Sequence, residues 1–201
     1  MSGALVKILD GNTFVVSDER GDVEASLTDP TGLFSYDTRF LSTWILSVNG
    51  ERLNALSVDD LNYYEARFFL VPGTGTVYVD SKLSVIRRRA VGNGFREELT
   101  ILNHDEAPVT LKVRLDAASD FADLFEVKDA LKKKGTYRER AKGKELWLEY
   151  QRDTFVRSTV ITSSAPAKVD KGGLTFTVKL EPHGEWSTDL EVVTTAVGMG
   201  T

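Results

Sequence analysis

Apolar and polar residues alternate with a period of two along much of this 201-residue chain. Over residues 111–115, leucine and valine alternate with lysine and arginine. A period of two also appears in Leu146, Leu148 and Tyr150, in Leu174, Phe176, Val178 and Leu180, and in Trp186, Thr188, Leu190 and Val192. Successive side chains of a strand point to opposite faces, so this pattern buries one face of a sheet and exposes the other. The alternation predicts an all-β protein built from antiparallel strands.

Turn signals separate the predicted strands. Asn49-Gly50 lies between Phe40–Val48 and Arg52–Val58, and this dipeptide readily adopts the positive φ angles of a two-residue hairpin turn. Gly92–Gly94 marks a second hairpin. Strands that recur about every 8–12 residues are typical of a sandwich or barrel, and a chain of about 200 residues suits one such domain. We therefore predict a single antiparallel β-sandwich of many strands over residues 1–201.

One segment departs from the period of two. Between residues 120 and 131, Phe121, Leu124 and Phe125 have helical spacing, and Asp120 is a suitable N-cap. The sequence thus predicts at most one short helix near 120–131.

Composition disfavours several classes of function. The chain has no cysteine, only two histidines (His104 and His183), and a formal net charge of -5. This leaves no recognisable metal site or cofactor motif, and it disfavours nucleic-acid binding, which usually requires a basic domain. No apolar run approaches the ~18 residues of a membrane span. We expect a soluble, cytoplasmic protein without a cofactor, and a homo-oligomer remains open.

Carboxylates near residue 120 are the best candidates for chemistry. Glycoside hydrolysis needs two carboxyl groups, about 5–5.5 Å apart for retention of configuration. Asp120 and Asp123 have a spacing that could meet this distance on a helical turn. The first turn of a helix favours the same residues for structural reasons, so we assign no catalytic residue.

Exposed aromatic side chains are candidates for stacking on sugar rings. Trp44, Trp147 and Trp186 lie in strands with core-like alternation, whereas Tyr63 and Tyr64 border a loop. Core packing is the favoured interpretation for the tryptophans, and exposure for the tyrosines.

Three separated stretches resemble one known family. They are Leu9–Asp18 (LDGNTFVVSD), Gly32–Ser42 (GLFSYDTRFLS) and Ser119–Lys128 (SDFADLFEVK). Together they resemble the N-terminal domain of bacterial proteins described as glycogen debranching enzymes, or amylo-α-1,6-glucosidase-like proteins, from about Leu5 to about Thr195.

This resemblance implies a β-sandwich that precedes a larger helical-barrel catalytic domain in a parent glycoside hydrolase. The catalytic carboxylates are expected on that barrel, which this chain lacks. Asp37 and Arg39 in the second stretch, and Asp120 and Asp123 in the third, are weak candidates for substrate contacts. Structural pairing is the alternative for Asp37 and Arg39.

Three functions remain open. The first is a non-catalytic accessory domain that packs on a helical-barrel domain of the same parent chain and shapes its active-site mouth. The second is an independent carbohydrate-binding module for α-glucans. The third, which we rank lowest, is a small glycosidase that uses Asp120 and Asp123.

Overall fold

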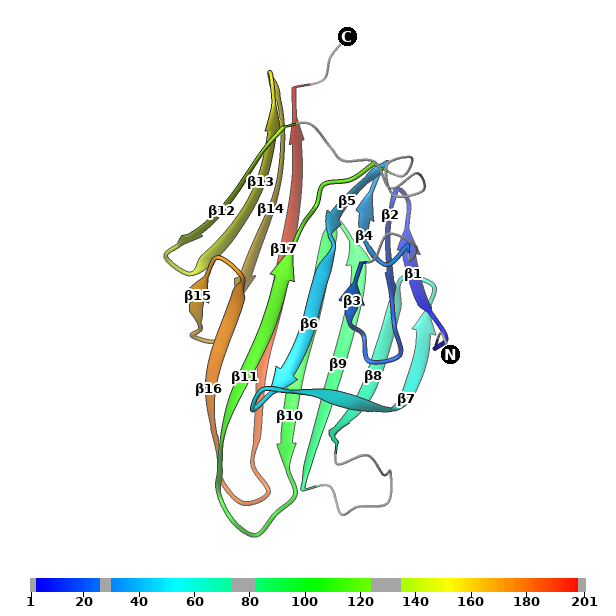
Figure 1. Cartoon of the computed structure of the whole chain (residues 1–201). Coiled ribbons are helices and arrows are strands. Elements are labelled where there is room, and N and C mark those ends of the chain that lie inside the picture. Colours follow the sequence, from blue (N-terminus) through cyan, green and yellow to red (C-terminus); the bar gives the residue numbers. More distant parts are fainter. Residues whose placement is uncertain (1–2, 26–29, 74–81, 124–134, 199–201) are drawn as a thin grey trace.

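The computed structural model of the chain describes residues 3–25, 30–73, 82–123 and 135–198. These residues form antiparallel strands and no helix (Figure 1), which confirms the predicted all-β class. In the described ranges, no helix is long and apolar enough to cross a membrane.

A large sheet folds over on itself to make the two layers of the sandwich (Figure 1). The first layer consists of β3 (Val23–Glu24), β6 (Thr43–Val48), β11 (Val109–Ala118), β15 (Lys168–Asp170) and β16 (Gly173–Leu180). The second layer consists of β8 (Glu65–Pro72), β9 (Leu83–Gly92), β10 (Gly94–Asn103), β12 (Thr136–Lys142), β13 (Glu145–Arg152), β14 (Phe155–Ser163) and β17 (Glu185–Val197).

Strand β7 (Glu51–Asn62) connects the two layers. It pairs with β6 through Glu51 and Arg52 and then with β8 from Leu53 onward. Its register with β8 is irregular between Ala55 and Ser57, as expected where a strand bends out of one layer into another.

A second, small sheet has the strand order β1-β2-β4-β5. Its strands are β1 (Val6–Asp10), β2 (Thr13–Ser17), β4 (Gly32–Ser35) and β5 (Thr38–Leu41). In Figure 1 it lies beside the upper part of β8 and β9, and β1 contacts both of those strands.

The predicted hairpins form where the turn residues lie. Asn49 and Gly50 have φ angles of 52° and 81°, so both adopt the positive values that a two-residue turn between β6 and β7 requires. Gly92 and Gly94 pair with each other across the β9–β10 turn. Local sequence therefore determines both connections.

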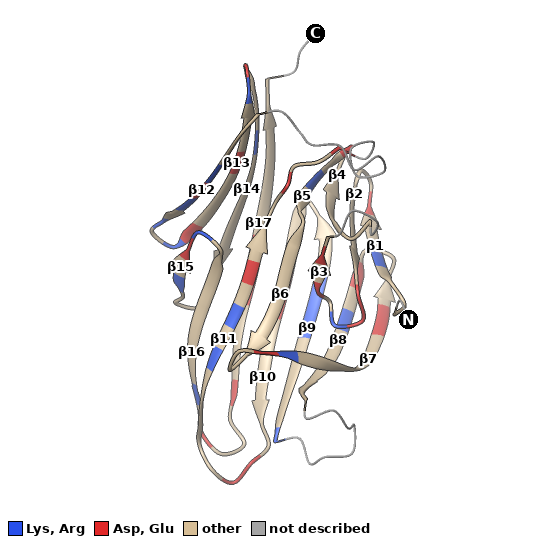
Figure 2. Ribbon diagram, in the orientation of Figure 1, with Lys and Arg blue, Asp and Glu red and all other residues tan. Residues whose placement is uncertain are grey.

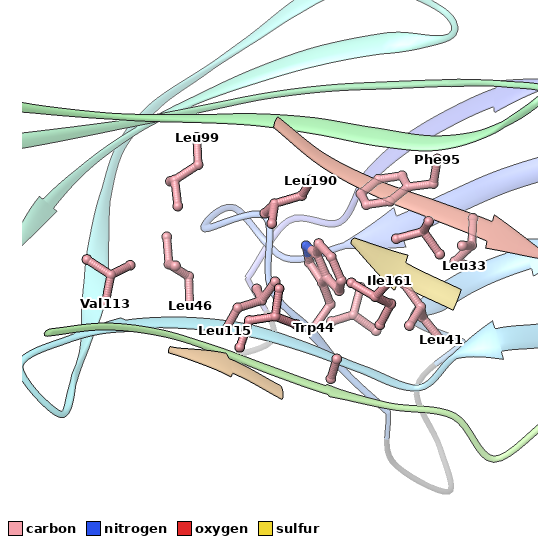
Figure 3. Close-up of a cluster of buried hydrophobic side chains, with 14 of the residues drawn as sticks. Leu33, Leu41, Trp44, Leu46, Phe95, Leu99, Val113, Leu115, Ile161 and Leu190 are labelled. Atoms are coloured by element: carbon pink, nitrogen blue, oxygen red, sulfur yellow. The ribbon is translucent and has the colours of Figure 1, made fainter. Parts of the chain in front are cut away.

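Alternating apolar side chains from the two layers fill the core. Leu111, Val113 and Leu115 of β11 are all buried, as their spacing predicts. Figure 3 shows Leu46 and Val113 of the first layer facing Leu99 and Leu190 of the second. Burying one such side chain stabilises the fold by about 1.5–3 kcal/mol.

The core also encloses a cluster of charges, hereafter the buried ion cluster, formed by Asp22, Arg87, Arg89 and Glu97. Figure 2 shows basic residues in the middle of β9, where Arg87 and Arg89 lie. Glu97 is the cross-strand partner of Arg89 on β10, and it accepts hydrogen bonds from Arg89 Nε at 2.9 Å and Arg87 Nε at 3.3 Å. The two positive and two negative charges balance within the protein interior.

The buried ion cluster connects the two layers. Trp44 of β6 donates its indole N–H to Glu97 at 3.2 Å, and Arg87 Nη1 lies 2.6 Å from Asp22 in the β2–β3 connection. Burial opposes ionisation of Glu97, but the charges of Arg87 and Arg89 outweigh it and hold the pKa of Glu97 below its usual value. The carboxylate is thus ionised because its partners are fixed around it.

The short helix predicted near 120–131 does not begin at Asp120. Residues 120–122 are not helical, and Asp123 forms an isolated β-bridge with Thr38. The Asp120 carboxylate accepts hydrogen bonds from Arg39 as well as from the Ala122 backbone, so it anchors this segment to β5 and does not cap a helix. The remainder of the predicted helix, residues 124–131, lies outside the described residues.

Candidate functional site

The β4–β5 turn presents two exposed side chains of the GLFSYDTRFLS stretch. Tyr36 has a φ angle of 53° and its side chain is 73% exposed, and Asp37 beside it is exposed as well. The Tyr36 N–H donates to Asn12 O at 2.8 Å, which ties this turn to the β1–β2 turn. A backbone fixed in this way projects Tyr36 and Asp37 into solvent.

Arg39 holds the base of this turn from inside the protein. Its guanidinium donates two hydrogen bonds to the Asp120 carboxylate, Nε to Oδ1 at 3.1 Å and Nη2 to Oδ2 at 2.5 Å. A third hydrogen bond runs from Nη1 to Thr31 O at 3.2 Å. A bidentate arginine–carboxylate pair fixes both distance and plane, so it joins β5 rigidly to the segment after β11.

Aromatic contacts extend this anchor to the second layer. Phe121 is buried between Phe40, whose ring centroid lies 6.0 Å away, and Tyr150 on β13, at 6.2 Å. The Tyr137 hydroxyl of β12 donates to Asp120 O at 3.1 Å. The 119–123 segment is therefore packed on both sides.

The four residues predicted as weak substrate contacts thus have different environments. Arg39 and Asp120 contact each other, and Asp123 pairs through its backbone with Thr38. Asp37 is exposed, and its side chain makes no hydrogen bond or ion pair with another described residue. The structure therefore brings three of them together at the base of the turn and leaves Asp37 at its tip.

An open groove lies elsewhere, between the N-terminal segment and the β7–β8 turn. It has a volume of about 490 Å³, and its lining includes Leu5, Lys7, Glu19, Asp60 and Tyr63. Ligand sites in proteins typically measure about 300–1,000 Å³. We refer to this feature as the Tyr63 groove.

Tyr63 and Tyr64 form an aromatic pair at the edge of this groove. Tyr63 is 69% exposed, and its ring centroid lies 5.1 Å from that of Tyr64 with the two planes nearly perpendicular. The exposure predicted for these two tyrosines is confirmed. The sequence did not identify Glu19 as a neighbour of Asp60 and Asn62, because it comes from a segment about 40 residues away and shares no motif with them.

The tryptophans do not form an aromatic platform. Trp44 is fully buried against Phe95, and Trp186 packs on Phe176 with a centroid distance of 5.3 Å. Trp147 is partly buried and donates its indole N–H to Glu145 at 2.7 Å. Core packing, as predicted, accounts for Trp44.

Known proteins resemble this chain at the level of family and of fold. A family model described as the N-terminal domain of (some) glycogen debranching enzymes matches residues 8–191. The search of curated proteins gave no significant match.

Solved structures share the fold at low sequence identity. A kojibiose phosphorylase-like protein from the human microbiome aligns with a TM-score of 0.54 and 13% identity, over 88% of this chain and 25% of that chain. An aldose 1-epimerase-like protein from Escherichia coli K12 aligns with a TM-score of 0.52 and 6% identity, over 96% and 99% of the two chains. The chain thus spans a quarter of the first protein and nearly all of the second.

Proposed function

Since the chain belongs to the family of N-terminal domains of (some) glycogen debranching enzymes, we propose that it is a non-catalytic accessory domain of an α-glucan-processing enzyme of cytoplasmic carbohydrate metabolism. In this proposal residues 1–201 form one domain, which packs against a helical-barrel catalytic domain of the same parent chain and shapes its active-site mouth. The family match over residues 8–191 is the observation that carries the proposal.

The β4–β5 turn is the contact surface that we propose for the catalytic domain. Tyr36 and Asp37 are exposed at its tip, while Arg39 and Asp120 hold its base. A large aromatic side chain on a preorganised loop is a typical interface anchor, because little conformational entropy is lost when it is buried. Asp37 is the residue of the predicted set that remains available to a glucan or to the catalytic domain.

The environment of Asp120 supports a non-catalytic role. A general acid or a nucleophile must have its carboxylate accessible to the glycosidic bond. The Asp120 side chain is 40% exposed, and both of its oxygens accept hydrogen bonds from the Arg39 guanidinium. This pairing argues against the glycosidase that would use Asp120 with Asp123.

Removing the domain from its parent enzyme tests this proposal. We expect the catalytic domain alone to have a lower Tm and lower turnover of glycogen than the same domain joined to this chain. Differential scanning calorimetry and release of reducing sugar measure the two effects. A catalytic domain with unchanged Tm and unchanged turnover would refute the accessory role.

A glucan-binding module is the second candidate function, and the Tyr63 groove favours it. An exposed aromatic ring beside unpaired polar side chains is an arrangement that can bind a sugar. The two functions are compatible, because the groove and the β4–β5 turn are formed by different residues.

A further inference from the structure

The Tyr63 groove contains polar side chains that have no partner within the protein. Lys7, Glu19 and Asp60 line it, and none of their side chains makes a hydrogen bond or ion pair with another described residue. Other charged groups in the described part of the fold do pair with each other, as Arg114 does with Asp170 and Arg88 with Glu65. The groove therefore offers free donors and acceptors around one exposed aromatic ring.

The turn that carries the ring is held in place by backbone hydrogen bonds. Tyr63 O accepts a hydrogen bond from the Leu9 N–H at 2.8 Å, and Tyr64 O accepts one from the Val91 N–H at 3.0 Å. These bonds attach the β7–β8 turn to β1 and to β9. Contact with Tyr64 then restricts the Tyr63 side chain. A turn whose backbone is already fixed loses little entropy on binding, which favours affinity for a small ligand.

We propose that the Tyr63 groove binds a short, neutral α-linked glucan, with the Tyr63 ring stacked on the apolar C–H face of one pyranose. The carboxylates of Glu19 and Asp60 accept hydrogen bonds from sugar hydroxyls, and the Lys7 ammonium donates one. The choice of an α-glucan as the ligand rests on the proposed function, whereas the place where it binds is inferred from the groove residues.

The charges in the groove select for an uncharged polyhydroxyl ligand. Each sugar hydroxyl has one donor hydrogen and can also accept, so several hydroxyls of one sugar can donate to the carboxylates of Glu19 and Asp60 and accept from the ammonium of Lys7. Two carboxylates beside one ammonium repel a phosphorylated or nucleic-acid ligand. Hydrogen bonds to charged groups are also stronger than those between neutral groups, by a factor of about two.

Isothermal titration calorimetry of maltoheptaose into the 201-residue chain tests the proposal. We expect saturable binding that weakens about tenfold or more in Tyr63→Ala, because the apolar contact between the ring and the sugar is lost. Tyr63→Phe keeps the ring and is expected to bind within about threefold of the unsubstituted chain. Val193→Ala is the control, since it shortens an exposed apolar side chain on β17 that does not line the groove, and its binding is expected to be unchanged.

A second variant covers the case in which Tyr63→Ala unfolds. The double variant Glu19→Gln, Asp60→Asn keeps the aromatic pair and the groove, and we expect it to weaken maltoheptaose binding at unchanged Tm. Absence of heat at millimolar maltoheptaose, or equal affinity in Tyr63→Ala, would overturn the inference. If the chain still stabilises its catalytic domain in that case, the accessory role stands and only the groove assignment fails.

Discussion

Buried arginines hold the parts of this protein together. Among the described residues, Arg39, Arg87 and Arg89 are all buried, and each contacts a carboxylate. Arg89 also lies over the Phe68 ring, with its guanidinium carbon 4.7 Å from the ring centroid. Removing one partner from such a pair leaves an uncompensated charge in the interior, which costs far more than losing an exposed pair.

Glu97 is the residue whose loss should affect the fold most. Glu97→Gln removes the negative charge between Arg87 and Arg89, so we expect the free energy of unfolding to fall by about 3–5 kcal/mol. Urea denaturation, monitored by circular dichroism, measures this free energy of unfolding.

Asp59→Asn provides the comparison for Glu97→Gln. Asp59 pairs with Arg67 at 3.1 Å near the surface, so we expect its loss to cost about 0–1 kcal/mol. Equal effects of the two substitutions would contradict the proposed role of the buried ion cluster.

Asp170 should make stability depend on pH. Hydrogen bonds from Arg114, at 2.5 and 2.9 Å, lower the pKa of Asp170 to about 2. Because the folded-state pKa lies below the unfolded value of about 3.9, the pair stabilises the fold above that value. This contribution is lost as the pH falls through the folded-state pKa.

Asp170→Asn removes this pH-dependent contribution. The side chain is 48% exposed, so we expect an effect of no more than about 1 kcal/mol near neutral pH. Thermal unfolding at a series of pH values should show the Tm difference between the two proteins shrinking between about pH 4 and pH 2. A difference that stays constant over this range would contradict the assignment.

At the scale of the strand, glycines with positive φ lie where one strand ends and the next, antiparallel strand begins. A Cβ added at Gly50 meets no heavy atom within 4 Å, whereas one at Gly173 would lie 2.0 Å from Leu115 O on the neighbouring strand. Gly50→Ala should therefore cost about 1–2 kcal/mol through backbone strain alone.

Gly173→Ala should cost clearly more than Gly50→Ala, because the β11–β16 pairing must also shift. Denaturant unfolding of both variants measures the difference. A smaller effect at Gly173 would show that strand β11 moves aside without loss, against the close packing seen there.

Features that depend on residues close together in sequence were predicted correctly, whereas features that depend on distant residues were not. The hairpin at Asn49-Gly50 and the alternation in β11 depend on neighbouring residues, and both were predicted correctly. The start of the predicted helix at Asp120 was wrong because Arg39, which is 81 residues away, binds its carboxylate. The turn of β7 from one layer to the other likewise depends on a partner that local sequence does not specify.

The candidate sites also depend partly on residues that are distant in sequence. The exposure of Tyr63 follows from its position next to a loop, and it was predicted. Glu19 and Asp60 enter the same groove from the β2–β3 connection and from β7, so only the folded chain brings them together. Arg87 pairs with Asp22, which is 65 residues away, so no local pattern identifies this partner.

At the scale of the whole molecule, two exposed features of the described structure are candidates for contacts with other molecules. The β4–β5 turn presents Tyr36 and Asp37, and the Tyr63 groove presents an aromatic ring with free charges. In the function proposed above, the first surface contacts a catalytic domain and the second binds a glucan.

Direct association of this chain with the catalytic domain of its parent enzyme is the measurement that tests the accessory role. Titration of the two separately expressed domains in a calorimeter should give saturable one-to-one binding. A variant with Tyr36→Ser and Asp37→Lys should weaken it at least about tenfold while its Tm stays unchanged. The absence of binding between two folded domains would contradict the account.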